Sequence, residues 1–326
     1  MNNCNNLIAG MVLAGSIVTG TATAQEAGSA LATFTVALVE PDITTVPLLA
    51  AIDAMREAGN DIAIVELAEP ELAIEGLALG RYAISAESTS PALIAHERGA
   101  PIVLIGDVVG NQWGFYAQDG IESCEDLDGK PVGIFSEGAV ATAMIRTWIA
   151  ENCGSARPQF LVIGGSDVRA QALQAGEITA TALELADVAA LEAAGTPLGE
   201  PLADFSKDLP DLHPQTIYAN SEFLAASPGA AQAFIDAVAG EHERINADPA
   251  YLVGLVEKYL PDSVTPSLPG TAQKYVEAGL FDVTALTEEN VQYTIDFFVE
   301  AGVISEGMSA ADAADLTFSQ NASTGR

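Results

Sequence analysis

Residues 130–154, KPVGIFSEGAVATAMIRTWIAENCG, combine a strand, a turn and a helix. Val132–Phe135 predict a short buried strand, and Ser136–Gly138 predict a tight polar turn. Apolar side chains then recur at helical spacing, at Val140, Met144, Ile145, Trp148 and Ile149. Because a helix N-terminus directs unpaired N–H groups beyond the sheet, this unit predicts a small-ligand site at the turn.

Strands and helices also alternate over the hundred residues before this stretch. Strands are predicted at 32–40, 61–68 and 101–109, with another after Arg81, and helices at 44–59 and 70–80. This alternation predicts a parallel sheet that is covered on both faces. In such sheets ligands bind beyond the carboxyl ends of the strands.

The pattern restarts after about residue 120, which predicts a second α/β lobe. Residues 77–84 and 173–180 echo each other, since both contain a helix end, a glycine and a strand. From about residue 220 the chain is mainly helical, and residues 321–326 predict a disordered tail.

The N-terminus resembles a secretory signal. An apolar stretch ends at Ala22-Thr23-Ala24, which predicts a signal peptide over residues 1–24. The first basic residue of the chain is Arg56, so an uncleaved anchor is the alternative. Cys4 lacks a Leu-x-x-Cys context, and we expect no lipidation. Export predicts a periplasmic protein.

Cleavage would leave two cysteines, Cys124 and Cys153. If oxidised, they would close a loop of about 30 residues and contribute about 3–4 kcal/mol. The alternative is two unrelated thiols. His96, His213 and His242 are isolated in the sequence, so we expect no metal site and no cofactor.

The net charge of −33 limits the partners of this chain. Such a surface repels nucleic acid and anionic lipid. Two interpretations remain: an acidic coat suited to a salty medium, and a field that attracts cations.

Four segments together resemble the periplasmic substrate-binding proteins of ABC importers, in the branch of nitrate, alkanesulfonate and thiamine-pyrimidine-precursor binders. They are STSPALIAHERGAPIVLIG, GIESCEDLDGKPVGIFSEGAVATAMIRTWI, ALQAGEITATALELADVAALEAAG and IYANSEFLAASPGAAQAFIDAV. The most specific phrase is Ile121-x-x-x-x-Asp126-Leu127-x-Gly129-Lys130-x-Val132-Gly133. The resemblance covers most of residues 33–250.

The resemblance implies a two-lobe periplasmic-binding-protein fold of type II, with a mainly parallel sheet flanked by helices in each lobe. Lobe 1 would comprise residues 31–115 and 215–320, and lobe 2 residues 116–214. The lobes would close on a small molecule, and a monomer would deliver it to an ABC permease and ATPase. The implied ligand contacts are Glu40, Asp42, Glu87, Ser88, Thr89, Ser136, Glu137, Gly138, Ala139 and Glu184.

The sequence departs from an anion binder at these positions. Five of them are acidic, and no Lys or Arg lies in the same turns, so a ligand with amine, amidine or aminopyrimidine donors fits better. Trp113 and Tyr116 could stack on it. The alternatives are that these aromatic rings form core between the lobes, that some acids face solvent, and that the ligand is a nitrate- or sulfonate-type anion.

An enzyme is the competing class. Thiamine-pyrimidine synthases share this fold but use a histidine and a cysteine cluster, which this chain lacks. We also find no G-x-S-x-G elbow, P-loop or H-E-x-x-H motif. Glu137 and Glu184 could act as an acid–base pair. We expect a carrier, with no catalytic residue.

Overall fold

The computed structural model describes Met1, residues 31–121 and residues 123–322. The predicted signal peptide lies outside these residues apart from Met1, as does Cys4. From Leu31 onward the chain packs as one compact unit that contains two five-stranded sheets.

The first sheet has the strand order β2-β1-β3-β10-β4. Strands β1, β2 and β3 are parallel, and β10 runs antiparallel between β3 and β4. Its elements and connecting helices are β1 (Thr33–Val39), α1 (Val46–Glu57), β2 (Asp61–Leu67), α2 (Pro70–Ala78), β3 (Ile84–Ser88), α3 (Thr89–Glu97), β4 (Ile102–Val109) and β10 (Gln215–Asn220).

The second sheet has the order β7-β6-β8-β5-β9, with β5 as its antiparallel strand. Its elements are β5 (Gly114–Ala117), η1 (Cys124–Leu127), β6 (Pro131–Ile134), α4 (Val140–Asn152), β7 (Gln159–Val162), α5 (Ser166–Ala175), β8 (Ala180–Leu183), α6 (Leu185–Ala193), β9 (Ala203–Asp204) and α7 (Phe205–Asp208). The two orders correspond strand for strand. The predicted α/β class with two mainly parallel sheets is therefore confirmed.

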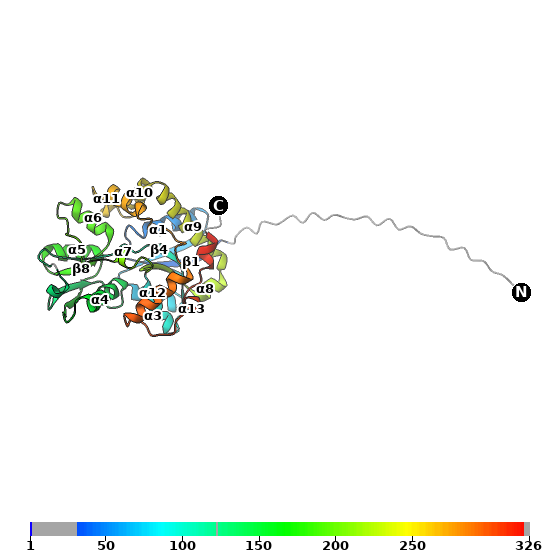
Figure 1. The fold of residues 1–326 in the computed structure, drawn as a ribbon. Coiled ribbons are helices and arrows are strands. Elements are labelled where there is room, and N and C mark those ends of the chain that lie inside the picture. Colours follow the sequence, from blue (N-terminus) through cyan, green and yellow to red (C-terminus); the bar gives the residue numbers. More distant parts are fainter. Residues whose placement is uncertain (2–30, 122, 323–326) are drawn as a thin grey trace. The chain divides into compact units, whose positions relative to one another are not determined.

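Alternating side chains explain why helices cover both faces of the first sheet. In β1, Val36 and Leu38 join the core beneath α1, whereas Ala37 and Val39 pack against Ala73 of α2. The second sheet is covered in the same way, by α4 on one face and by α5 and α6 on the other. In Figure 1 the elements of the second sheet, drawn in green, gather in one half of this unit.

Two short segments connect the sheets, residues 110–113 and 209–214. The second sheet begins at Gly114, just before the predicted boundary between the lobes. One core cluster contains residues of both sheets, for example Leu104 of β4 and Val132 of β6. Movement of two lobes relative to each other stays a prediction.

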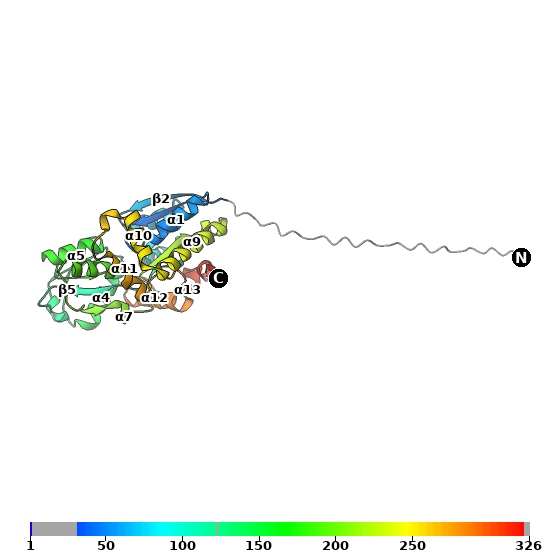
Figure 2. The same ribbon diagram turned by 90° about the horizontal axis from the view of Figure 1, so that it is seen from above.

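The C-terminal third is helical and packs mainly on the first sheet (Figure 2). Its elements are α8 (Ser221–Ala226), α9 (Pro228–Ala247), α10 (Pro249–Tyr259), η2 (Pro261–Ser263), α11 (Leu268–Glu277), α12 (Glu288–Glu300), α13 (Ala310–Ala313) and α14 (Thr317–Ala322). The predicted tail needs a correction at its start, since Asn321 and Ala322 belong to α14, where Phe318 is buried against the core. Residues 323–326 lie outside the description.

Cys124 and Cys153 form a disulfide, with their Cα atoms 4.8 Å apart. It joins η1 to the residue that follows α4, and both cysteines are buried. In the part of the chain that the structure describes, no helix is both long and apolar enough to cross a membrane.

Candidate functional site

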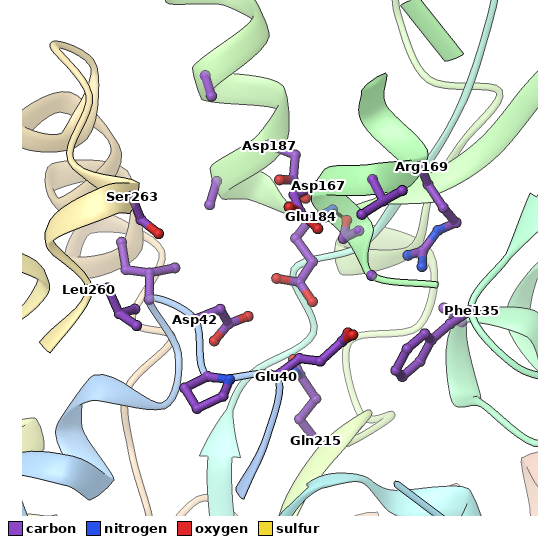
Figure 3. A pocket seen from close by; sticks show the side chains of 18 of the residues that line it. Glu40, Asp42, Phe135, Asp167, Arg169, Glu184, Asp187, Gln215, Leu260 and Ser263 are labelled. Atoms are coloured by element: carbon purple, nitrogen blue, oxygen red, sulfur yellow. Dashed lines mark hydrogen bonds between the residues drawn. The ribbon is translucent and has the colours of Figure 1, made fainter. Parts of the chain in front are cut away.

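A pocket of about 710 Å³ lies where strands of both sheets end (Figure 3). Its walls come from the end of β3 and from the segments that follow β1, β6, β7 and β8, together with η2 and the start of α11. This is the position that parallel α/β sheets offer to ligands.

The lining of the pocket is strongly acidic. It contains seven carboxyl side chains, those of Glu40, Asp42, Glu87, Asp167, Glu184, Asp187 and Asp262. Arg169 is the one basic side chain among the described residues that line it. Across residues 31–121 and 123–322, none of these seven acids forms an ion pair with Lys, Arg or His. Apart from Arg169, these ranges of the chain thus supply no cation to the carboxyl groups of the pocket.

Asp42 and Glu184 form a carboxyl pair between segments of the two sheets. Figure 3 shows their carboxyl groups directed toward the same space, and they share a hydrogen bond. Glu184 is only 7% exposed, and Asp42 is half-buried. The backbone N–H and the hydroxyl of Thr44 both donate to Asp42 Oδ1, at 2.8 and 2.7 Å. These bonds fix the orientation of Asp42.

Burial raises the pKa of both acids in this pair. For Asp42 the bonds from Thr44 oppose the effect without cancelling it. For Glu184 the charges of Asp42, Asp187 and Glu87 raise the pKa further, to well above the ordinary value. Two adjacent buried carboxyl groups cannot both ionise at low cost unless a cation joins them.

Glu87 lies beside this pair, at the end of β3. Burial, followed by the charge of Asp42, raises its pKa to about 8. Its side chain is hydrogen-bonded to Gln215, which in turn accepts from Gln112 Nε2 at 3.3 Å. Gln112 also accepts from the Tyr275 hydroxyl. This chain of polar groups connects a segment between the sheets to the pocket.

The first turns of α5 and α6 face the pocket and already carry acids. Asp187 stands in the first turn of α6, where its side chain bonds Ser166, and burial raises its pKa to about 6. The Glu184 backbone N–H donates to Ser166 Oγ at 3.2 Å. Asp167 stands in the first turn of α5. Helix N-termini attract anions, and here carboxylates of the chain occupy that position.

Arg169 is buried and held by its own chain. Its guanidinium donates to Thr181 Oγ1 at 3.1 Å, to the Ala182 carbonyl at 3.2 Å and to the Gly164 carbonyl. It also stacks on the ring of Trp113, with its Cζ 5.8 Å from the ring centroid. Burial lowers its pKa, while the acids around it oppose that shift. Arg169 thus braces the wall and offsets part of the acidic charge.

The structure brings together seven of the twelve predicted ligand contacts, although they come from distant parts of the sequence. They line the pocket at Glu40, Asp42, Glu87, Ser88, Trp113, Ala139 and Glu184. All of them lie at the end of a strand, after a strand or in the segment between the sheets, which is why the pattern of strand ends identified them.

The predicted turn at Ser136–Gly138 does not line this pocket. The Ser136 hydroxyl donates to Glu71 Oε1 at 3.0 Å, and exposed Glu137 pairs with Arg146 at 2.6 Å. The carbonyl of Gly138 accepts from the Ser90 hydroxyl at 2.6 Å. The polar groups of the turn are therefore bonded to other residues of the protein.

Thr89 and Tyr116 also lie outside the pocket lining. The Thr89 hydroxyl is fully buried and donates to the His213 carbonyl at 2.7 Å. Tyr116 sits in β5 on the face that packs against α5 and α6, because alternate residues of a strand point to opposite faces. Its ring therefore packs between the second sheet and these helices, outside the pocket.

Sequence analysis did not identify Asp167, Arg169, Asp187 and Gln215 as pocket residues. Asp187 is one helical turn beyond Glu184, which follows β8. Asp167 is the second residue of α5, just after the segment that follows β7. Asp167 and Asp187 could have been predicted, because both lie close to the end of a strand in the sequence. Arg169 and Gln215 gave no such signal, since one lies inside a helix and the other begins a strand. In the described part of the chain no group of His, Cys, Asp and Glu is arranged to hold a metal ion.

Comparison with solved structures shows what this fold resembles. The ligand-binding component of an ABC-type import system from Staphylococcus aureus, solved with zinc bound, is 14% identical, with a TM-score of 0.70 over 90% of this chain and 99% of that one. The alkanesulfonate-binding protein SsuA from Xanthomonas axonopodis pv. citri, bound to MOPS, is 16% identical (TM-score 0.68, 89% and 100% covered). The periplasmic nitrate-binding protein NrtA from Synechocystis PCC 6803 is 10% identical (TM-score 0.62, 90% and 85% covered).

These similarities confirm the predicted periplasmic-binding-protein fold. No curated protein sequence matches the chain. Residues 55–250 match a protein family described as NMT1/THI5 like, which is more than half of the chain. By this match the chain belongs to the NMT1/THI5-like family.

Proposed function

We propose that this protein is the extracytoplasmic solute-binding component of an ABC importer and that it captures a small amine-bearing cation. The ligand would lie in the acidic pocket between the two sheets. The fold supports the carrier role, because similar structures are binding components of import systems. The charge of the pocket supports the choice of ligand.

One observation carries the choice of a cation: seven carboxyl groups line the pocket and none has an ion-pair partner among the described residues. A unit charge 4 Å from another contributes about 4 kcal/mol at an effective dielectric constant of 20. A bound ammonium near Asp42 and Glu184 would be stabilised by this attraction, whereas a nitrate or sulfonate would be repelled. Arg169 offsets only part of that repulsion.

We further propose that the ligand leaves the pocket chemically unchanged. No histidine or cysteine is found among the described residues that line the pocket. The alternative of a different class is a thiamine-pyrimidine-synthase-like enzyme, and the alternative within the fold is an anion binder. A carrier returns its ligand intact, whereas an enzyme converts it. Mass spectrometry of the small molecule before and after incubation therefore distinguishes the carrier from the enzyme.

A thermal-shift panel tests the proposed ligand class. The exported chain is heated with amines, amidines and aminopyrimidines, and in parallel with nitrate and ethanesulfonate. A ligand at 100 times its dissociation constant adds about 2.7 kcal/mol, which is readily measured. We expect stabilisation by a cationic compound. Stabilisation by anions alone would overturn the proposal.

Export and delivery can be tested in cells. We expect the processed chain in the periplasmic fraction, and uptake of the ligand that depends on an ABC permease and ATPase. A chain that stays anchored in the inner membrane would favour the uncleaved signal, and uptake that is independent of this protein would contradict the carrier role.

A further inference from the structure

We infer that the ligand carries two positive charges, as a short aliphatic diamine does. This inference rests on the proposed function and specifies its ligand. Two carboxylate pairs line the pocket, and each pair joins one acid from the first sheet to one from the second. We call Asp42 and Glu184 the inner pair, and Glu40 and Asp167 the outer pair.

Thr44 donates to the Asp42 half of the inner pair, but the described part of the chain supplies no such donor to the Glu184 half. The Glu184 side chain is nine-tenths buried and faces the pocket (Figure 3). Apart from the Asp42 carboxyl, no group among the described residues is hydrogen-bonded to it. An ammonium has three N–H donors and a positive charge, so it can bond both carboxylates at once.

An aromatic side chain stands in the wall of the same pocket, and its unpaired N–H is a donor that would bond an acceptor atom rather than an ammonium. The indole N–H of Trp113 is buried and has no hydrogen-bond partner in the described part of the chain, and Trp113 lines the pocket. Its ring already stacks on a cation, the guanidinium of Arg169. The aromatic wall is therefore compatible with a second cation close by.

The outer pair converges at Gly165. A Cβ atom on this glycine would lie 2.8 Å from Asp167 Oδ1 and 3.1 Å from Glu40 Oε2. The two carboxylates therefore meet around one point, which only a residue without a side chain leaves open. Neither has an ion-pair partner among the described residues. Both side chains are exposed, so this site lies nearer the mouth of the pocket.

The backbone at Glu40 is held in an unusual conformation. Its φ is +39°, and no other non-glycine residue in the described ranges has a positive φ. Such a conformation is costly for a residue with a Cβ and recurs at binding sites. Here it belongs to a residue of the outer pair, immediately after β1. The geometry thus sets two cation positions in one pocket, with each position bridging the two sheets.

Calorimetric titration of the exported chain tests the inference at pH 8 and 20 mM NaCl. The probes are the α,ω-diamines from 1,3-diaminopropane to 1,6-diaminohexane, each compared with the monoamine of the same length. At least one diamine should bind about three- to tenfold more tightly than its monoamine, because exposed ion pairs contribute modestly. The preference should shrink in 1 M NaCl, since exposed charges are screened.

Two variants assign the sites. In the double variant Glu40→Gln with Asp167→Asn, the ratio of diamine to monoamine affinity should fall to about one. Glu184→Gln should weaken both amines at least tenfold. Glu177→Gln is the matched control, because Glu177 is exposed and does not line the pocket. Circular dichroism confirms that each variant folds.

The outcomes separate the inference from the proposed function. If a monoamine and its diamine bind equally at low salt, the two-charge inference is overturned and the amine carrier stands. If the double variant keeps the diamine preference, the outer pair is not the second site and the inference falls. If no amine binds, both the inference and the proposed function are overturned.

Discussion

Binding of an amine should release a proton from the pocket, and Glu87 makes the size of this effect calculable. Its pKa is about 8 in the ligand-free protein, because it is buried beside Asp42 and near Glu40. At pH 7, about nine-tenths of the Glu87 side chains then carry a proton. An aliphatic ammonium, with a pKa near 10, stays charged throughout this range.

The sign of the pH dependence follows from which form binds the cation. A cation stabilises ionised Glu87, so affinity must rise as the pH rises. If the bound cation returns the pKa from about 8 to its ordinary value of 4.5, affinity increases about 50-fold between pH 6 and pH 8. The same change releases about 0.9 proton per ligand at pH 7 and about 0.1 at pH 9.

Calorimetry measures this release directly. Titration of 1,4-diaminobutane at pH 7, in buffers of different ionisation enthalpy, gives an apparent heat whose slope is the number of protons released. Glu87→Gln should reduce that slope, and Glu177→Gln should leave it unchanged. A zero slope at pH 7, together with equal affinities at pH 6 and pH 8, would refute the reasoning.

Three further predictions concern single features. Glu184→Gln should weaken amine binding at least tenfold in calorimetry, and an unchanged dissociation constant would remove this residue from the site. Replacing Cys124 and Cys153 by serine should lower the free energy of unfolding by about 3–4 kcal/mol in urea denaturation, because the disulfide closes a 29-residue separation; equal midpoints would contradict this. Ionisation of Glu87 opposes folding, because its pKa is higher in the folded protein. The stability that protonated Glu87 contributes is fully present below pH 4.5 and is lost as the pH rises through about 8. Between pH 5 and pH 7 the parent should thus lose about 2.5 kcal/mol of unfolding free energy that Glu87→Gln keeps. Melting temperatures that change in parallel with pH in the two proteins would count against this.

Local patterns in the sequence predicted the two sheets well. The stretch at 130–154 forms β6, a turn and α4 as expected, because the apolar spacing changes from strand to helix at the turn. The pairing of strands far apart in sequence was not visible in this way. The antiparallel strand β10, for example, returns to the first sheet after the whole second sheet has formed.

The site was predicted where strand ends determine position. Glu40, Glu87 and Glu184 lie at or after such ends and line the pocket. The turn at Ser136–Gly138 has the same local pattern but does not line the pocket. Its polar groups bond Glu71, Ser90 and Arg146 instead. Those contacts depend on how α2, α3 and α4 pack, which no local pattern encodes.

The basic side chain of the pocket illustrates the same limit. Arg169 lies in α5 among polar residues, and its sequence position resembles that of a solvated arginine. It is buried because the carbonyls of Gly164 and Ala182 converge on its guanidinium. Only the three-dimensional arrangement shows that its donors bond the chain.

A crystal structure of the protein with 1,4-diaminobutane tests the central claim most directly. We expect one nitrogen within hydrogen-bond distance of the carboxyl groups of Asp42 and Glu184, with its amine group unmodified. The second nitrogen should lie between Glu40 and Asp167. An anion bound at the Arg169 guanidinium, or a diamine bound outside this pocket, would contradict the account.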